Sequence, residues 1–327
     1  MRAALHFAQG EMNVKVSVIM TVFNGARYLT ESIPAILHQS YVNFELLIID
    51  DASTDDSLEI IEMYAAQDSR VSVIRNRTNK GQPESRNTAL RQATGGYIAV
   101  NDADDISLPD RFKLQVRYLE EHPEVFLLGG AALVRYGNYE PVLKKSVTGA
   151  DENASRLPRY NHMVHSTIMF RNTGEARYRC KFLMSQDYDL YLNLLSKGYQ
   201  IDNLAAPLIV YSVDDTSISS TKSRKRIFFS SHARKFYHQR RQQGKDEYHR
   251  FDPEAIINSG VDERSADPLG GLRNYINIIV YEDKKKALAV IVKNSLRLKP
   301  AYILNKVILL LTPLSVMHKL RERRRPD

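Results

Sequence analysis

The chain has 327 residues, 43% of them hydrophobic and 26% charged, which is ordinary for a globular protein that buries a sizeable core. The one cysteine, Cys180, excludes an internal disulfide framework and fits a reducing compartment. The net charge of +8 is uneven, because residues 216–327 carry 24 Lys and Arg against 11 Asp and Glu, and the remainder carries 22 against 27. The acidic part before residue 216 predicts metal and phosphate chemistry, and the basic part after it predicts contact with an anionic surface or partner.

Short apolar segments alternate with helical patterns over the first hundred residues. Strands are expected at residues 16–22, 44–49 and 71–74 and from Tyr97, with a helix between each pair. This alternation predicts βαβ units, and therefore a mostly parallel sheet with right-handed crossovers and flanking helices. Ligands of such sheets bind beyond the carboxyl ends of the strands. Polar groups follow three of those ends, at residues 21–24, 50–51 and 101–104.

The acidic turn after the strand at Tyr97 is the first candidate site. Asp102 and Asp104 are separated by one small residue, so on an extended chain both carboxylates point to the same side. Two such oxygen donors suit Mg²⁺ or Mn²⁺ that is bound mainly through a diphosphate. The alternative is a polar turn that starts the next helix, since residues 107–110 have the form of a capping box. That alternative accounts for Asp105 and Ser107 but leaves Asp102 unexplained.

Another carboxylate opens a helix further along the chain. Strands are expected within residues 125–134 and at 165–171, and an apolar pattern predicts a helix that begins after Asp187. Asp187 is either a cap or dipole partner of that helix, or a functional carboxylate. Asp189 lies two residues on, where a helix turns it roughly 200° away. His165 has no second His at ligand spacing, so it is expected to be structural or to face an acceptor rather than to bind a metal.

The character of the chain changes after residue 216. A basic helix is expected at residues 222–241, a polar connection at 248–268, and helices from Leu272 with an interruption at 282–286. The apolar stretch 302–314 is too short to span a bilayer, which needs about 20 residues. It is followed by a basic tail, so it is either a helix docked on the core or an interfacial helix on anionic lipid. Residues 1–13 are expected to be an extension without a secretory signal, which favours a cytoplasmic location, with peripheral attachment to the membrane as one form of it.

Seven motifs in order resemble those of the family 2 glycosyltransferases, the inverting nucleotide-sugar enzymes of GT-A fold. The resemblance covers residues 16 to about 219, at positions 16–24, 49–55, 79–87, 95–105, 165–171, 186–190 and 217–219. It implies a GT-A, Rossmann-like catalytic domain at residues 14–219, followed by a basic, mainly helical region at 220–327. It also implies a metal-dependent transfer of a sugar from a nucleotide-diphosphate donor to an acceptor hydroxyl.

The resemblance implies a role for each matching residue. The nucleotide base and ribose would be cradled by Thr21, Val22, Phe23 and Asn24, and Asp51 would hydrogen-bond the base, which as uracil offers an imide N–H. Arg86 and Asn87 would lie near the sugar-phosphate. Asp102 would face ribose and metal, Asp104 the metal, and Asp187 would be the general base. The cofactor would be Mn²⁺ or Mg²⁺, the donor a UDP-sugar, and the acceptor a glycan or lipid-linked glycan of bacterial cell-surface polysaccharide or glycolipid assembly.

This sequence departs from the family pattern at three places, and other functions compete. Gln186 stands where many relatives have Glu, Asn193 stands where they often carry Arg, and no His precedes the motif at residues 217–219. A nucleotidyltransferase would need a glycine-rich basic loop after the first strand, of which residues 23–27 are a poor version. A phospho-receiver domain would end near residue 120 and would lack the second acidic cluster. An RNA-binding function would depend only on the basic half, which lacks aromatic platforms, so no nucleic acid partner is expected.

Overall fold

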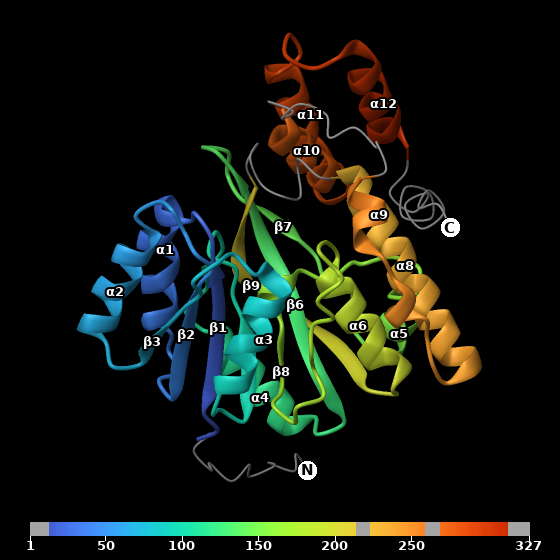
Figure 1. Ribbon diagram of the computed structural model, residues 1–327. Helices are drawn as coiled ribbons and strands as arrows, with labels where there is room; N and C mark the ends of the chain where they lie inside the picture. The colour runs from blue at the N-terminus through green and yellow to red at the C-terminus, as the bar shows by residue number, and fades with distance from the viewer. Residues whose placement is uncertain (1–12, 214–222, 259–268, 313–327) are drawn as a thin grey trace, which may run out of the picture.

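The computed structural model describes residues 13–213, 223–258 and 269–312, and a nine-stranded sheet lies at its centre (Figure 1). The strand order is β3-β2-β1-β4-β8-β6-β9-β5, and β7 pairs with β6. The strands are β1 (Val16–Val22), β2 (Phe44–Asp50), β3 (Val71–Arg75), β4 (Tyr97–Val100), β5 (Ile106–Ser107), β6 (Val125–Tyr136), β7 (Val142–Lys144), β8 (Met169–Arg171) and β9 (Gln200–Val213). The first four follow the predicted segments closely.

The sheet is mostly parallel, as the sequence predicts. β1 pairs in parallel with β2 and β4, and β2 pairs in parallel with β3. β8 runs antiparallel between β4 and β6, so β6 and its parallel neighbour β9 point the same way as the first four strands. Of the described strands, only β5, β7 and β8 run in the opposite direction. The carboxyl ends of β1, β2 and β4 therefore meet at one edge.

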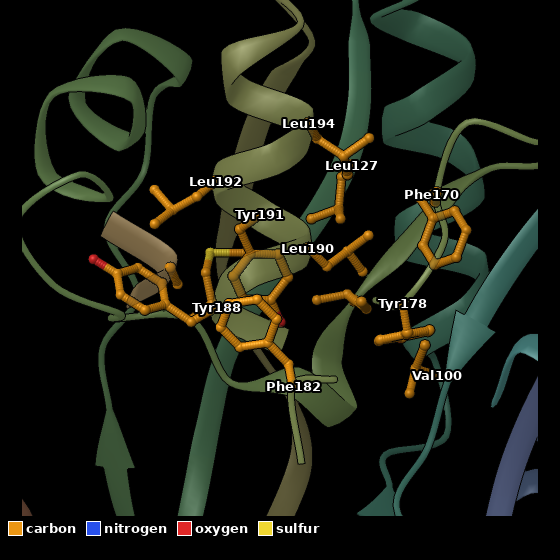
Figure 2. Packing of buried hydrophobic residues seen from close by; sticks show 14 of the residues in the cluster. Val100, Leu127, Phe170, Tyr178, Phe182, Tyr188, Leu190, Tyr191, Leu192 and Leu194 are labelled. Atoms are coloured by element: carbon orange, nitrogen blue, oxygen red, sulfur yellow. The ribbon is translucent and has the colours of Figure 1, made fainter. Parts of the chain in front are cut away.

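Helices cover both faces of the sheet because alternate strand residues are apolar on both sides. On β1, Val18 and Met20 pack in one cluster with α1 (Ala26–Leu37), α2 (Ser57–Gln67) and α4 (Arg111–Glu121). Ile19 belongs to the other cluster, with α3 (Gln82–Gln92), α6 (Gln186–Ser196) and α8 (Ser223–Gln243). Figure 2 shows part of that second cluster, including Phe182 and, on α6, Tyr188 and Leu190. The site is thus carried by a three-layer α/β/α sandwich.

Two local predictions were wrong. The capping box is absent, since Ser107 belongs to β5 and its Oγ donates to Asn101 Oδ1 at 2.8 Å. The helix α4 instead begins at Arg111 after Asp110. Only the end of segment 165–171 is a strand, because residues 165–167 form a short 3₁₀ helix, η1 (His165–Thr167). A further helix, α5 (Ala150–Arg156), lies in a polar segment that has no clear period.

The described C-terminal part is mainly helical, as expected, but η2 (Tyr248–Arg250) and α9 (Pro253–Ile257) lie in the segment predicted to be a polar connection, and they pack beside α8. The helices α10 (Gly270–Glu282), α11 (Lys284–Lys293) and α12 (Pro300–Leu311) dock on β7 and on the carboxyl ends of β6 and β9. Leu272, Tyr275 and Ile276 of α10 pack with Val134 of β6 and Val142 of β7. No helix among the described residues is both long enough and apolar enough to cross a membrane. The expected domain boundary at 219/220, the motif at 217–219 and most of the predicted N-terminal extension lie outside the described residues.

Candidate active site

The polar groups that follow β1, β2 and β4 lie together at the carboxyl edge of the sheet. The N–H of Asp51 donates to Val22 O at 2.8 Å, and the N–H of Asn101 donates to Ile19 O at 3.1 Å. A Cβ added to Gly25 would meet Val22 Cγ1 at 3.3 Å and Ala103 Cβ at 3.8 Å. The turn that leads into α1 therefore packs against the turn between Asp102 and Asp104, and the absence of a side chain at Gly25 permits this approach.

The end of β1 presents both a polar atom and an exposed ring. Thr21 Oγ1 is buried, and the described part of the chain offers it no hydrogen-bond partner. Val22 is buried, whereas Phe23 is 52% exposed. Asn24 adopts a positive φ of 53°, and its side-chain Oδ1 accepts from the N–H of Thr54 at 2.8 Å. An unpaired buried hydroxyl costs free energy, so a polar ligand group at this point would stabilise the site.

Asp51 has a structural role in addition to any contact with a base. It is 4% exposed, and its carboxylate accepts from Asn76 Nδ2 at 2.7 Å, from Lys80 N at 2.9 Å and from Gly81 N at 2.9 Å. Asn76 also donates to Ser85 Oγ in α3. Asp51 therefore fixes the loop that leads into α3, and only its remaining lone pairs are available to a ligand. Its predicted contact with the base stays a prediction.

A buried ion pair joins α3 to the acidic turn. Arg86 is 2% exposed, and its Nη2 donates to Asp102 Oδ1 at 2.6 Å. Burial raises the pKa of Asp102, but the neighbouring charges, that of Arg86 first, and the hydrogen bonds to the carboxylate together outweigh it, so the pKa of this carboxyl lies below its usual value. Arg86 Nη1 is buried, and none of the described residues accepts a hydrogen bond from it. A buried guanidinium N–H without an acceptor favours an anionic ligand oxygen beside it.

Asp104 lines a hollow of about 240 Å³ next to the first turns of α1. The other lining groups include Arg27 and Arg135. Among the described residues there is no cluster of three or more His, Cys, Asp or Glu side chains that could hold a metal ion. Asp102 and Asp104 supply at most two protein carboxylates, which suits Mg²⁺ or Mn²⁺ that takes its other ligands from phosphate and water. This donor set fits the expected cation and does not fit a closed structural metal site.

The remaining members of the acidic turn are structural. Asp105 is buried and accepts from the N–H of Ser212 at 3.1 Å. Burial, together with the negative charges of Asp104 and Asp102, raises the pKa of Asp105 well above its usual value. Arg111 lies beneath the turn, where it donates to Asn101 Oδ1 at 2.9 Å and to Val100 O at 2.7 Å. These contacts fix the backbone that carries Asp102.

Asp187 lies in the first turn of α6, near the buried Arg86 that pairs with Asp102. Asn161 Nδ2 donates to Asp187 Oδ2 at 2.8 Å, which orients the carboxylate. Gln186 Nε2 donates to Gln82 Oε1 at 2.7 Å and so ties the start of α6 to the start of α3. The Cζ of Arg86 lies 5.4 Å from the ring centre of Tyr178, and His165 links the Tyr178 hydroxyl to that of Tyr191 on α6. The structure therefore brings Asp187 to the part of the site that contains Arg86.

His165 is held between two tyrosines. Its Nδ1 shares a hydrogen bond with the Tyr191 hydroxyl at 2.7 Å, and its Nε2 shares one with the Tyr178 hydroxyl at 3.0 Å. Burial, and after it the positive charge of Arg86, lowers the pKa of His165 to about 4, against the opposing charges of Asp102 and Asp187. The ring is neutral near pH 7 and both nitrogens are engaged, which favours the structural one of the two roles expected from the sequence.

Two nearby side chains are engaged by the protein itself. The amide of Asn87 donates to Tyr178 O at 2.8 Å and accepts from Tyr178 N at 3.0 Å, so it holds that segment in place. Its expected place near the sugar-phosphate stays a prediction. Asp189 is buried, and both of its oxygens accept from Arg179. Because this fork occupies the carboxylate, Asp189 is unsuited to act as a base.

Sequence reasoning did not find Asn161, Tyr178, Tyr191 or Arg111. Asn161 and Tyr178 lie in irregular segments that have no period and no motif. Tyr191 and Arg111 lie on helices, where they are indistinguishable from packing or surface residues in a single sequence. Only the pairing of distant segments reveals their roles.

A mostly parallel sheet that gathers an Asp-x-Asp turn, a buried Arg and a helix-borne Asp at its carboxyl edge is typical of nucleotide-sugar transferases of GT-A fold. The chain matches the family model for Glycosyl transferase family 2 over residues 17–185, and it belongs to that family. It is therefore a glycosyltransferase.

Relatives and solved structures agree with this assignment. EpsE of Bacillus subtilis (strain 168) is 40% identical over 211 residues, which is 62% of this chain and 74% of that protein. The Escherichia coli protein WfaP, a UDP-Glc:alpha-D-GlcNAc-diphosphoundecaprenol beta-1,3-glucosyltransferase, is 31% identical and aligns over 65% of this chain and 82% of its own. The mannosyltransferase PcManGT of Pyrobaculum calidifontis, solved with GDP-Man and Mn²⁺, has a TM-score of 0.55 at 16% identity and covers 96% of this chain and 88% of its own. S. aureus TarS 1-349, solved with UDP-GlcNAc, has a TM-score of 0.54 at 18% identity, with 94% and 92% covered.

Proposed function

We propose that the chain transfers a sugar from a UDP-linked donor to a hydroxyl of a lipid-linked glycan during bacterial polysaccharide or glycolipid synthesis. Two relatives support this choice of substrates: WfaP and WfgD of Escherichia coli, both 31% identical to this chain, are named as transferring from UDP-Glc to a GlcNAc-diphosphoundecaprenol. Because PcManGT was solved with GDP-Man, the fold alone leaves the nucleotide open. The choice of UDP therefore depends on the sequence relatives.

The observation that carries the proposal is the pair of buried polar atoms without partners in the described part of the chain, Thr21 Oγ1 and Arg86 Nη1. Both lie at the edge where β1 and β4 end, and Arg86 is anchored by Asp102. In this proposal Arg86 receives an oxygen of the donor and the end of β1 receives the nucleoside. The exposed ring of Phe23 offers the base a surface for stacking. Such pre-placed groups bind without reorganisation of the protein.

A divalent cation would be held by Asp104 and Asp102. When bound, it supplies Lewis-acid neutralisation of the diphosphate that leaves. The depressed pKa of Asp102 keeps that carboxylate ionised at neutral pH, which favours cation binding. Burial of Arg86 in the same cluster adds a second positive charge near the leaving group, so the two would share its stabilisation.

Asp187 would take the proton of the acceptor hydroxyl as that oxygen attacks the sugar. Asn161 orients the carboxylate, and neutral His165 does not compete for the proton because tyrosine hydroxyls occupy both of its nitrogens. Attack from the face opposite the diphosphate forms the new C–O bond as the old one breaks, which inverts the anomeric centre. No protein nucleophile is needed for this single displacement.

The test is a panel of UDP-, GDP- and TDP-sugars, assayed for Mn²⁺-dependent thermal stabilisation and for hydrolysis by the full chain. We expect UDP-sugars to stabilise the protein, and Asp104→Ala to weaken Mn²⁺-dependent UDP binding by about tenfold or more, since one of two protein ligands is lost. Asp151→Ala, an exposed carboxylate on α5, is the matched control and should behave as the parent. Unchanged Mn²⁺-dependent affinity in Asp104→Ala would contradict the metal site, and a preference for GDP would contradict the choice of donor.

A further inference from the structure

The last two described helices carry apolar side chains on their outer surface. On α11 and the turn after it these are Leu288, Val292 and Leu296, spaced by four residues. On α12 they are Leu304, Ile308 and Leu311. All six are between 48% and 102% exposed. Such spacing forms one stripe along each helix, and we call the two stripes together the C-terminal face.

These stripes are not the surfaces by which the helices pack on the rest of the protein. Ala287, Val290 and Ile291 of α11 and Leu309 of α12 are buried in the cluster that includes α10. Lys284 at the start of α11 donates from Nζ to Leu310 O at 2.8 Å and also to Thr312 O, so it caps the end of α12. The two helices are thus tied together, and the apolar residues of the C-terminal face remain after the packing of both helices is complete.

The two helices and the turn between them carry charge of one sign, and the exposed Asp283 that caps the start of α11 precedes them. Residues 284–312 contain seven Lys and Arg and no Asp or Glu. Lys285, Arg297 and Lys299 are exposed at the start of α11 and in the turn between the helices. In Figure 1, α11 and α12 lie beyond the carboxyl end of β6, on the side of the sheet where β1, β2 and β4 also end. A partner at the C-terminal face would therefore lie on the same side of the sheet as the site.

We infer that the C-terminal face docks on an anionic lipid surface. An interfacial helix combines an apolar stripe that enters the headgroup region with basic side chains that meet the lipid phosphates, and α11 and α12 have both features. A second copy of the chain in symmetric contact would set one basic face against another, with no carboxylate in residues 284–312 to offset the repulsion. The charge therefore favours an anionic surface as the occupant.

The test is cosedimentation of the full chain with vesicles of phosphatidylglycerol and phosphatidylcholine, compared with phosphatidylcholine alone. The apolar variant is Leu296→Ser, Leu304→Ser and Ile308→Ser together. Its matched control replaces three exposed apolar residues elsewhere, Val42, Met63 and Leu114, by Ser. We expect the parent and the control to bind the anionic vesicles, and the apolar variant to bind about tenfold or more weakly.

A charge variant tests the inference separately, because its residues are exposed and its fold is not at risk. The variant that combines Lys285→Gln, Arg297→Gln and Lys299→Gln should bind anionic vesicles on the order of 100-fold more weakly, because each charge contributes about fivefold. Added salt should weaken the binding of the parent to these vesicles. Three results would overturn the inference. They are no binding of the parent to anionic vesicles at low ionic strength, parent-like binding by both variants, or a dimer of the parent that the apolar variant abolishes without any vesicle binding.

Discussion

The neutral state of His165 predicts a specific pH dependence of stability. The ring lies between the hydroxyls of Tyr178 and Tyr191, and its pKa falls from an ordinary 6.5 to about 4 because of burial and the charge of Arg86. Between about pH 6.5 and pH 4 the His165 ring is protonated in the unfolded chain and neutral in the folded chain. His165 therefore makes the folded state less stable as the pH falls through this window, and its effect is absent above pH 7.

The magnitude follows from the two pKa values. Between pH 7 and pH 5, a shift from 6.5 to about 4 lowers the free energy of unfolding by about 2 kcal/mol. His165→Gln removes the titrating ring but keeps one donor and one acceptor for the two tyrosines. The variant should therefore lose about 2 kcal/mol less than the parent over this range, because other titrating groups are common to both.

The assay is urea denaturation followed by circular dichroism at pH 7, 6 and 5 for the parent and for His165→Gln. The difference between the two proteins should grow steadily as the pH falls. If the two proteins show the same pH dependence within about 0.5 kcal/mol, the ring titrates normally when folded and the reasoning is refuted.

Three further substitutions test other parts of the structure. Asp189→Asn breaks the buried fork with Arg179 and should lower the free energy of unfolding by about 3 kcal/mol, against a small change for Asp187→Asn; equal urea midpoints would contradict this. Gly95→Ala would set a Cβ 2.5 Å from Lys15 O, so it should cost about 1–3 kcal/mol, and an unchanged melting temperature would speak against that packing. Asn161→Ala frees the carboxylate of Asp187 and should lower kcat roughly 10–100-fold with little change in the donor KM; parent-like turnover would exclude an orienting role.

The sequence predicts the N-terminal part of the fold well because that part depends on local patterns. Strand period, helix period and the turns between them place β1 to β4 and α1 to α3, and parallel strands then bring residues 21–24, 50–51 and 101–104 to one edge. Asp102 and Asp104 follow from the same logic. Each of these inferences needs only neighbours along the chain and one rule about parallel sheets.

The features that the sequence does not reveal depend on contacts between distant segments. Ser107 matches a capping box locally, but strand β9 pairs with it and outweighs the local preference. Backbone N–H groups of the loop before α3 donate to both oxygens of Asp51, and the backbone of Tyr178 hydrogen-bonds both the N–H and the oxygen of the Asn87 amide. Asn161 meets Asp187 across 26 residues of chain, and no single-sequence pattern records such a meeting.

The central claim is that Asp187 removes the acceptor proton in a single displacement. Asp187→Asn keeps the shape and an oxygen that can accept from Asn161, but the amide cannot take a proton. The most direct measurement is kcat of this variant with a UDP-sugar and a lipid-linked acceptor, together with its affinity for UDP and Mn²⁺. We expect kcat to fall about 10²–10⁴-fold while the affinity for UDP stays that of the parent. Normal turnover by Asp187→Asn with the correct donor and acceptor would contradict the account.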